Sequence, residues 1–591
     1  MYKRGTVPIF PLTFASAVVN NVDMYIATIP NRGSPPAILL REGYRADGKV
    51  KNRTLANLTH WPAPKVDLLR RVLRDEPLAP VDPLFEAVAS MHHGHVQAVR
   101  LAMQRLGFEA LIASRPCRER ALVVAMVAAR ILEPDSKLAT TRWWHTTTLP
   151  ESLGVADADE DDLYDAMDWL LARQERIEQK LAARHLTAGG LVLCDLTSSY
   201  FEGTTCPLAA LGHNRDGKKG KLQVNYALLT DGRGCPVAVS VFKGNTGDPK
   251  TLLPQVTRVR DRFGIEALVL VGDRGMISQT QIDALKALAG VDWITALKTG
   301  ALRGLVADGA LQLGLFDERN LFELTHPDFP GERLVACRNP ELAKLRAHKR
   351  HALLAATVKE LEKVRAMVAR GRLKGQDAIG VRVGKVVNKY KVAKHIRLEI
   401  DDARLDFHID EEQVAAEAAL DGLYVVRTSV PPERLSADDT VRSYKRLSAV
   451  ERAFRSLKTL DLKVRPIHHR RELRVRAHIF LCMLAYYVEW HLREAWRPLL
   501  FADEDQQAKA TRDPVAPAKR SAAALRKVHA KVLDDGTVVH SFQTLLKALS
   551  TIVHNVCRRR GAGPDEPTFQ IVTTPTPTQQ RAYDLLKTIT V

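Results

Sequence analysis

The chain has 591 residues, of which 46% are hydrophobic and 26% charged, so it can bury a large core without the help of disulfides. Its net charge of +19 and its pI near 9.6 predict nucleic acid or an anionic membrane as the partner. Seven singly spaced cysteines argue against a zinc module, and the absence of a long apolar run argues against a membrane span.

The first residues resemble a weak secretion signal, with two cations, an apolar centre and small residues after it. Prolines interrupt that centre, so we expect residues 1–23 to be an upstream extension and Met24 to be the native start. Residues 24–63 contain short strand-like segments around an Asp-Gly turn, which predicts a small β-rich segment. Residues 64–187 follow a helical pattern and predict a helical domain.

Residues 188–299 contain two apolar runs that read as buried strands. "GGLVLCDLTSSYFEG" is closed by Asp195, and "EALVLVGDRG" is closed by Asp273. A hairpin around Asp231 and a helix capped by Asp248 lie between them. This order of elements predicts an α/β unit with a mixed sheet.

Residues 300–437 interrupt that unit with a charged helix and alternating strands, which predicts an α+β insertion. The unit resumes at 438–500. There "SYKRLSAVERAFRSLK", residues 443–458, reads as one basic amphipathic helix, and a strongly apolar helix follows. Residues 501–591 contain a polar linker, a last helix over 541–560 and a Thr/Pro-rich tail.

The two strand-end acids suggest a metal site. Side chains that follow parallel strands emerge at the carboxyl edge of the sheet, where open α/β sheets place their ligands. Neighbouring carboxylates repel one another unless cations bridge them, and Mg²⁺ prefers carboxylate and phosphate oxygens. Two such ions, about 3.5–4 Å apart, can support phosphodiester cleavage. For either Asp195 or Asp273 alone, a turn or cap residue is the simpler interpretation.

Glu451 is a single acid within the basic helix. As an i,i+4 partner of Arg455 it would contribute only a few tenths of a kcal/mol. Alternatively, it is a third metal ligand beside the sheet. An apolar stripe lies next to the stripe that contains Glu451, and we expect it to pack the helix against the sheet. Its residues are Val450, Phe454 and Leu457.

At this point the residues resemble a known family. "CDLTSSYFEG", "GNTGD", "VGDRG" and Y-x6-E-x6-K resemble the DDE transposases of bacterial insertion sequences, in the branch with a Tyr-Arg-Glu-Lys signature. The resemblance spans Met24 to about Trp496. Tyr444 and Lys458 match the ends of the signature, whereas its arginine falls on Leu447, with Arg446 next to it.

The resemblance implies a ribonuclease-H-like catalytic domain in two parts, 188–299 and 438–500, with a β-rich insertion between them. It implies that Asp195, Asp273 and Glu451 are catalytic and bind two Mg²⁺ ions, for which Mn²⁺ can substitute. The helical region 64–187 would bind DNA ends. The residues expected to contact DNA are Tyr444, Lys458, Arg446, Arg455 and Arg274.

The partners implied are double-stranded DNA, as inverted-repeat ends and as target, and a second copy of the chain in a synaptic dimer, with no membrane. The location implied is the bacterial cytoplasm, close to the nucleoid. Two alternatives stay open at this stage. One is a structure-specific nuclease of the same fold, and the other is a non-catalytic repressor derived from a transposase.

Overall fold

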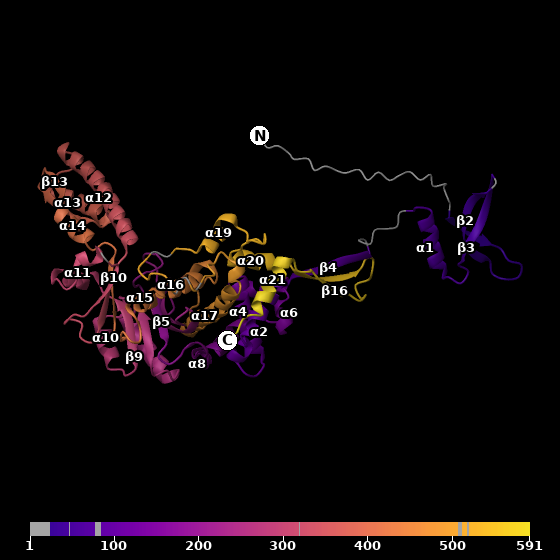
Figure 1. Cartoon of the computed structure of the whole chain (residues 1–591), viewed down its shortest axis with the longest axis horizontal. Coiled ribbons are helices and arrows are strands. Elements are labelled where there is room, and N and C mark those ends of the chain that lie inside the picture. The colour runs from indigo at the N-terminus through magenta and orange to yellow at the C-terminus, as the bar shows by residue number, and fades with distance from the viewer. Residues whose placement is uncertain are drawn as a thin grey trace. The chain divides into compact units, whose positions relative to one another are not determined.

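The computed structural model describes residues 24–46, 48–76, 84–317, 319–505, 507, 511–516 and 519–590. The upstream extension expected at residues 1–23 lies outside the described residues. The chain divides into two compact units, residues 1–89 with 556–570, and residues 90–555 with 571–591. Figure 1 shows the elements of both units along the chain.

The first unit begins with an antiparallel sheet of three strands in the order β1-β2-β3. Its elements are β1 (Met24–Ile29), β2 (Ala37–Ala46), β3 (Lys49–Asn57) and the helix α1 (Ala63–Leu73).

A second three-stranded sheet has the order β16-β15-β4. Its strands are β4 (Phe85–His92), β15 (Val553–Arg559) and β16 (Phe569–Val572). Here the sequence predictions were wrong, because both β4 and β15 fall in stretches expected to be helical. The helix expected over 541–560 stops at Ser550, and the β-branched run Thr551, Ile552 and Val553 explains the change, since such residues lose side-chain freedom in a helix and favour strands.

The second unit is built on a mixed sheet of eight strands in the order β10-β11-β14-β9-β8-β5-β6-β7. β5, β8 and β9 are mutually parallel, and the other pairs are antiparallel. This confirms the predicted α/β class with a mixed sheet. The strands are β5 (Leu191–Tyr200), β6 (Gln223–Asp231), β7 (Pro236–Lys243), β8 (Leu268–Gly272), β9 (Val291–Ala296), β10 (Leu321–Leu324), β11 (Arg333–Arg338) and β14 (Leu423–Thr428).

Helices that precede and follow the sheet strands in the sequence pack with the sheet in one hydrophobic core. The central one is α17 (Glu472–Ala495), which packs on α4, α7 and β7 and is buried along most of its length. None of the described helices is both long and apolar enough to cross a membrane. The other helices are α2 (Gly94–Arg105), α3 (Phe108–Ile112), α4 (Arg118–Leu132), α5 (Lys137–Trp143), α6 (Leu149–Leu153), α7 (Glu160–Leu171), α8 (Gln174–His185), α9 (Pro249–Thr257), α10 (Gln279–Lys286), α11 (Thr299–Ala307), α19 (Ala522–Ala530), α20 (Phe542–Ser550) and α21 (Pro577–Leu586).

The insertion between β11 and β14 is mainly helical, not β-rich as the resemblance implied. It comprises α12 (Pro340–Ala369), α13 (Gln376–Tyr390), the hairpin β12 (Ile396–Ile400) and β13 (Leu405–Ile409), and α14 (Glu411–Ala418). The composition of α12 explains the difference, because Ala, Leu, Lys, Glu and Arg are strong helix formers. These elements share a small core of their own.

The segment expected to be one helix over 443–458 is interrupted. It consists of α15 (Ala437–Lys445), α16 (Leu447–Arg455) and a π-helical turn at Ser456–Leu460. The backbone N–H of Arg446 is shared between the carbonyl oxygen of Arg442, its i−4 partner, and that of Ser443, its i−3 partner, each at 3.2 Å. The N–H of Ala449 then donates to the carbonyl oxygen of Arg446 at 2.8 Å, an i−3 bond, so the backbone tightens where the two helices meet.

Candidate active site

Asp195 and Asp273 lie at the same level on neighbouring parallel strands. The register of β5 and β8 pairs Cys194 with Gly272, so Asp195 on β5 is level with Asp273, the residue that follows β8. Adjacent strands are about 4.8 Å apart, so the two side chains start close together. Asp273 directly follows its strand, as predicted. Asp195 does not, because β5 continues to Tyr200 by pairing with β6 alone.

The environment of Asp195 disfavours its negative charge. The pKa of Asp195 is raised to about 7, chiefly by burial and also by the nearby carboxylates of Asp273 and Glu451. The Leu196 N–H, which donates to Oδ1 of Asp195 at 2.8 Å, opposes this rise. Asp273 and Glu451 are exposed. The three acids therefore concentrate negative charge at one point, with one partly buried and two exposed residues.

Glu451 is placed by the apolar face of α16. Val450, Phe454 and Leu457 are at most 6% exposed, and the Phe454 ring meets Tyr226 of the sheet edge-on with centroids 5.9 Å apart. α16 packs against β5 (Figure 1), so the predicted apolar stripe is confirmed. In the described part of the chain no ion pair joins Glu451 to Arg455, so the helix does not use this acid as a salt-bridge partner.

Tyr444 also lies at the acids. Burial raises the pKa of its hydroxyl to about 12, with Asp273 adding to the rise and the exposed Arg274 opposing it. The hydroxyl is therefore protonated at neutral pH and can donate a hydrogen bond.

Lys458 is buried and already paired. It is 8% exposed, and its Nζ lies 2.9 Å from Oδ1 of Asp216, which also pairs with Arg465. The backbone N–H of Tyr200 donates to the other Asp216 oxygen at 2.9 Å. A cleft of about 320 Å³ opens here, lined by Tyr200, Asp216, Lys218, Lys458, Thr459, Lys463 and Arg465. Lys458 is thus held at the wall of a cationic cleft and is not a free surface cation.

The sequence interpretation missed the loop between β5 and β6. Its Arg215 donates from Nη2 to both carboxylate oxygens of Asp248 at 2.6 Å and counteracts the raised pKa of Asp195. Asp248, expected to cap α9, makes no capping hydrogen bond and binds Arg215 instead. The charged run "NRDGKK", residues 214–219 between two predicted strands, was the feature of the sequence that could have indicated this loop as part of the site.

Leu447, which occupies the position of the arginine in the Tyr-Arg-Glu-Lys signature, and the neighbouring Arg446 both lie apart from the three acids. Leu447 is 8% exposed and belongs to the main core. The Arg446 guanidinium lies beside Gly232 and Leu191, where β5 begins, whereas Asp195 lies four residues further along that strand. Arg455 is exposed on α16.

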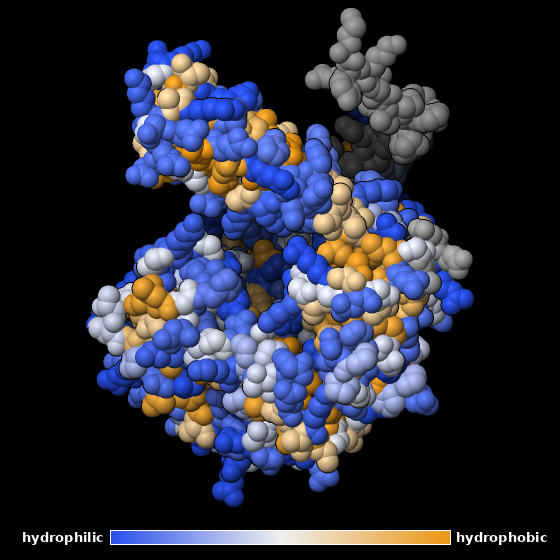
Figure 2. All heavy atoms as spheres, turned by 90° about the vertical axis from the view of Figure 1, so that its left-hand side faces the viewer, coloured by the Kyte–Doolittle hydropathy of each residue, from blue (hydrophilic) through white to orange (hydrophobic). Residues whose placement is uncertain are grey.

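The insertion leaves the sheet at the edge that carries the acids. β11 and β9 run in the same direction, because both are antiparallel to β14. The carboxyl end of β11, which leads into α12, therefore lies at the same edge as the carboxyl ends of β8 and β9. Figure 2 shows mostly hydrophilic residues on this end of the molecule, and a hollow in the surface below the upper lobe.

The carboxylates of Asp195, Asp273 and Glu451 fit a hard divalent cation. All three offer oxygen atoms, and the carboxylates of Asp273 and Glu451 add to the rise in the pKa of Asp195 that burial mainly causes, which a bridging cation would offset.

Comparisons with known proteins complete the description. Residues 191–488, half of the chain, match the family model described as "Transposase DDE domain", and residues 26–78 match "IS1634 family transposase, N-terminal domain". No curated protein matches the chain. Among solved structures, a piggyBac transposase synaptic complex with hairpin DNA is 10% identical over 77% of each chain, with a TM-score of 0.30.

Proposed function

Because the chain belongs to the family of transposases with a DDE domain, we propose that it binds the terminal inverted repeats of an insertion sequence and catalyses metal-dependent strand cleavage and strand transfer. The observation that carries this proposal is the meeting of three acids from distant parts of the chain. Asp195 and Asp273 are level on parallel strands, and Glu451 is near enough to raise the pKa of Asp195.

In this proposal Asp195, Asp273 and Glu451 hold two Mg²⁺ ions, or Mn²⁺ in their place, which supply an activated water and stabilise the leaving oxygen of the phosphodiester. The partly buried Asp195, with its raised pKa, is the ligand whose charge a cation would stabilise most, and the exposed Asp273 and Glu451 leave room for the DNA strand. Tyr444 keeps its proton and can donate to a phosphate oxygen beside the acids.

Cations around the acids suit DNA phosphates, which position a duplex without reading its sequence. Arg274 and Arg455 are exposed and fit this role, as does the cleft beside Lys458. Arg446 is also exposed, but it lies near the start of β5 and would contact phosphates further from the acids. We further propose that residues 64–187 contact the DNA ends, that the insertion covers the DNA at the acidic edge, and that two copies pair two ends before cleavage.

The experiment that tests this function is a strand-transfer assay with the full chain, Mg²⁺ and DNA taken from either side of its own gene. A transposase cuts at the element end and joins the freed 3′-hydroxyl to a target plasmid. Cleavage without joining would identify a nuclease instead. Binding without cleavage, in Mg²⁺ and in Mn²⁺, would identify a DNA-binding repressor.

A further inference from the structure

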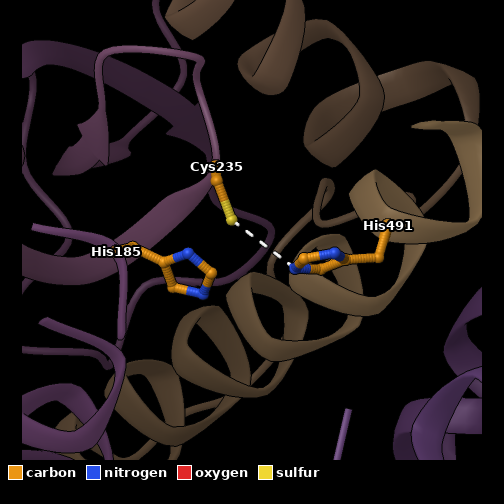
Figure 3. A group of neighbouring side chains, drawn as sticks. All are labelled: His185, Cys235 and His491. Carbon is orange, nitrogen blue, oxygen red and sulfur yellow. Dashed lines mark hydrogen bonds between the residues drawn. The ribbon is translucent and has the colours of Figure 1, made fainter. Parts of the chain in front are cut away.

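A second set of metal-type ligands lies far from the three acids in the sequence. His185 is the last residue of α8, Cys235 precedes β7, and His491 lies on α17. One potential ligand atom from each of the three side chains lies within 4.8 Å of the other two. Figure 3 shows the three side chains pointing toward one another from separate parts of the fold.

From this geometry we propose that His185, Cys235 and His491 bind a borderline-soft divalent metal ion, with Zn²⁺ as the natural occupant. A tetrahedral ion holds nitrogen and sulfur ligands at about 2.0–2.3 Å, which sets them roughly 3.5 Å from one another. Sγ of Cys235 and Nε2 of His491 are already 3.8 Å apart. Only a small movement of His185 is needed to complete the set.

The protonation states of the histidines suit this role. Burial lowers the pKa of His185 to about 4 and that of His491 to about 3, so both rings are neutral and keep a lone pair at physiological pH. Burial raises the pKa of the Cys235 thiol well above its usual value, and a bound metal ion would displace that proton.

Neighbouring residues hold the three proposed ligands in place through hydrogen bonds. Tyr487 holds His185 through a hydrogen bond of 3.0 Å between its hydroxyl and Nε2. Asp231 accepts the backbone N–H of Cys235 at 2.9 Å and also pairs with Arg233, so its carboxylate fixes the turn that carries the cysteine. Among the described residues no fourth His, Cys, Asp or Glu joins the set, so the fourth position is left to water.

A metal ion bound by His185, Cys235 and His491 would connect three separate elements of the fold. It joins α8, the turn between β6 and β7, and α17, which are distant in sequence. The same turn contacts the helix of Glu451, because a Cβ added at Gly234 would lie 2.7 Å from Cβ of Ala449. A metal that clamps the turn would therefore steady α16, although the inference itself does not rest on the proposed transposase activity.

The test is a Co²⁺ titration of the full chain, after reduction and removal of metal with a chelator. We expect about one equivalent of Co²⁺ to produce a thiolate-to-cobalt charge-transfer band, which a carboxylate site cannot give, and Zn²⁺ to abolish it. Cys235→Ser should lose the band. Cys117→Ser is the matched control, because Cys117 is exposed and outside the set, and it should keep the band.

Two outcomes would overturn the proposal. One is a wild-type chain with reduced thiols that gives no such band, which would leave the three residues as a packed neutral cluster. The other is a band that survives Cys235→Ser undiminished. If Cys235→Ser does not fold, His491→Gln replaces it, and its expected result is a weaker band whose shape has lost the tetrahedral signature.

Discussion

At the residue scale, Leu447 shows why the family signature cannot simply be restored. The side chain is 8% exposed and packs in the main core. We predict that Leu447→Arg lowers the free energy of unfolding by roughly 2–4 kcal/mol, because it forces a charge into an apolar contact. Ser448→Arg adds the same charge at the exposed next position and should cost less than about 0.5 kcal/mol. Chemical denaturation of both variants measures this, and equal losses would contradict the packing role.

Lys137 is a second residue whose environment can be tested. It is 4% exposed, and burial lowers its pKa to about 7, with Arg130 adding to the effect. Between that pKa and the unfolded value of 10.5 the native state binds fewer protons, so this group makes stability rise with pH across the window. We predict that Lys137→Met stabilises the chain by roughly 2–4 kcal/mol at about pH 6, and that the gain shrinks toward about pH 10. Denaturation midpoints at both pH values would show it, and a gain independent of pH would contradict it.

At the scale of elements, the position of α16 depends on the turn before β7. Gly234 has φ +88°, and a Cβ there would lie 2.7 Å from Cβ of Ala449. We predict that Gly234→Ala lowers DNA cleavage as well as stability, because it pushes against the helix that carries Glu451. Gly264 has φ +70° and open space around it, so Gly264→Ala reproduces the backbone strain without the collision. Cleavage rates normalised to the folded fraction distinguish the two variants. An equal loss of cleavage in Gly234→Ala and Gly264→Ala would argue against a role for the contact between Gly234 and Ala449.

Local patterns predicted some elements well and others poorly. The apolar run before Asp273 and the stripe of Val450 and Phe454 each depend on neighbours in the sequence, and both were confirmed. The pairing of Arg215 with Asp248 depends on how a long loop folds back over the sheet, which no local period encodes. The break at Arg446 was equally hidden, because the residues on both sides favour a helix and the i−3 hydrogen bonds at the junction have no signal in the sequence.

At the scale of the whole molecule, the insertion is a separable part of the second unit. Asn339 and Gly422 lie opposite each other, with the Asn339 N–H donating to the Gly422 carbonyl oxygen at 2.9 Å. Deleting residues 340–421 would join them as an Asn-Gly dipeptide, the preferred two-residue hairpin turn. We predict that this variant still unfolds cooperatively but binds end DNA at least about tenfold more weakly, because phosphate contacts at the acidic edge are lost. Circular dichroism and DNA titration test this, and unchanged affinity would remove the insertion from the DNA-binding surface.

At this scale the sequence predicted the class of fold and the order of its parts, including an interruption between Asp273 and Glu451. It did not predict that β11 and β14 inside the interrupted range belong to the main sheet, because sheet membership is set by pairing between distant segments. The boundaries of the DNA-end-binding region at 64–187 stay a prediction, as do the roles of the individual site residues.

In the proposed function, Glu451 completes a metal-binding triad with Asp195 and Asp273. The most direct measurement compares Glu451→Gln with Ser448→Ala, an exposed position on the same helix, in Mg²⁺-dependent cleavage of end DNA at matched DNA occupancy. We predict that Glu451→Gln binds the DNA like the wild type but cuts it no faster than background, while Ser448→Ala cuts at the wild-type rate. Cleavage by Glu451→Gln at the wild-type rate would show that Glu451 is not a metal ligand.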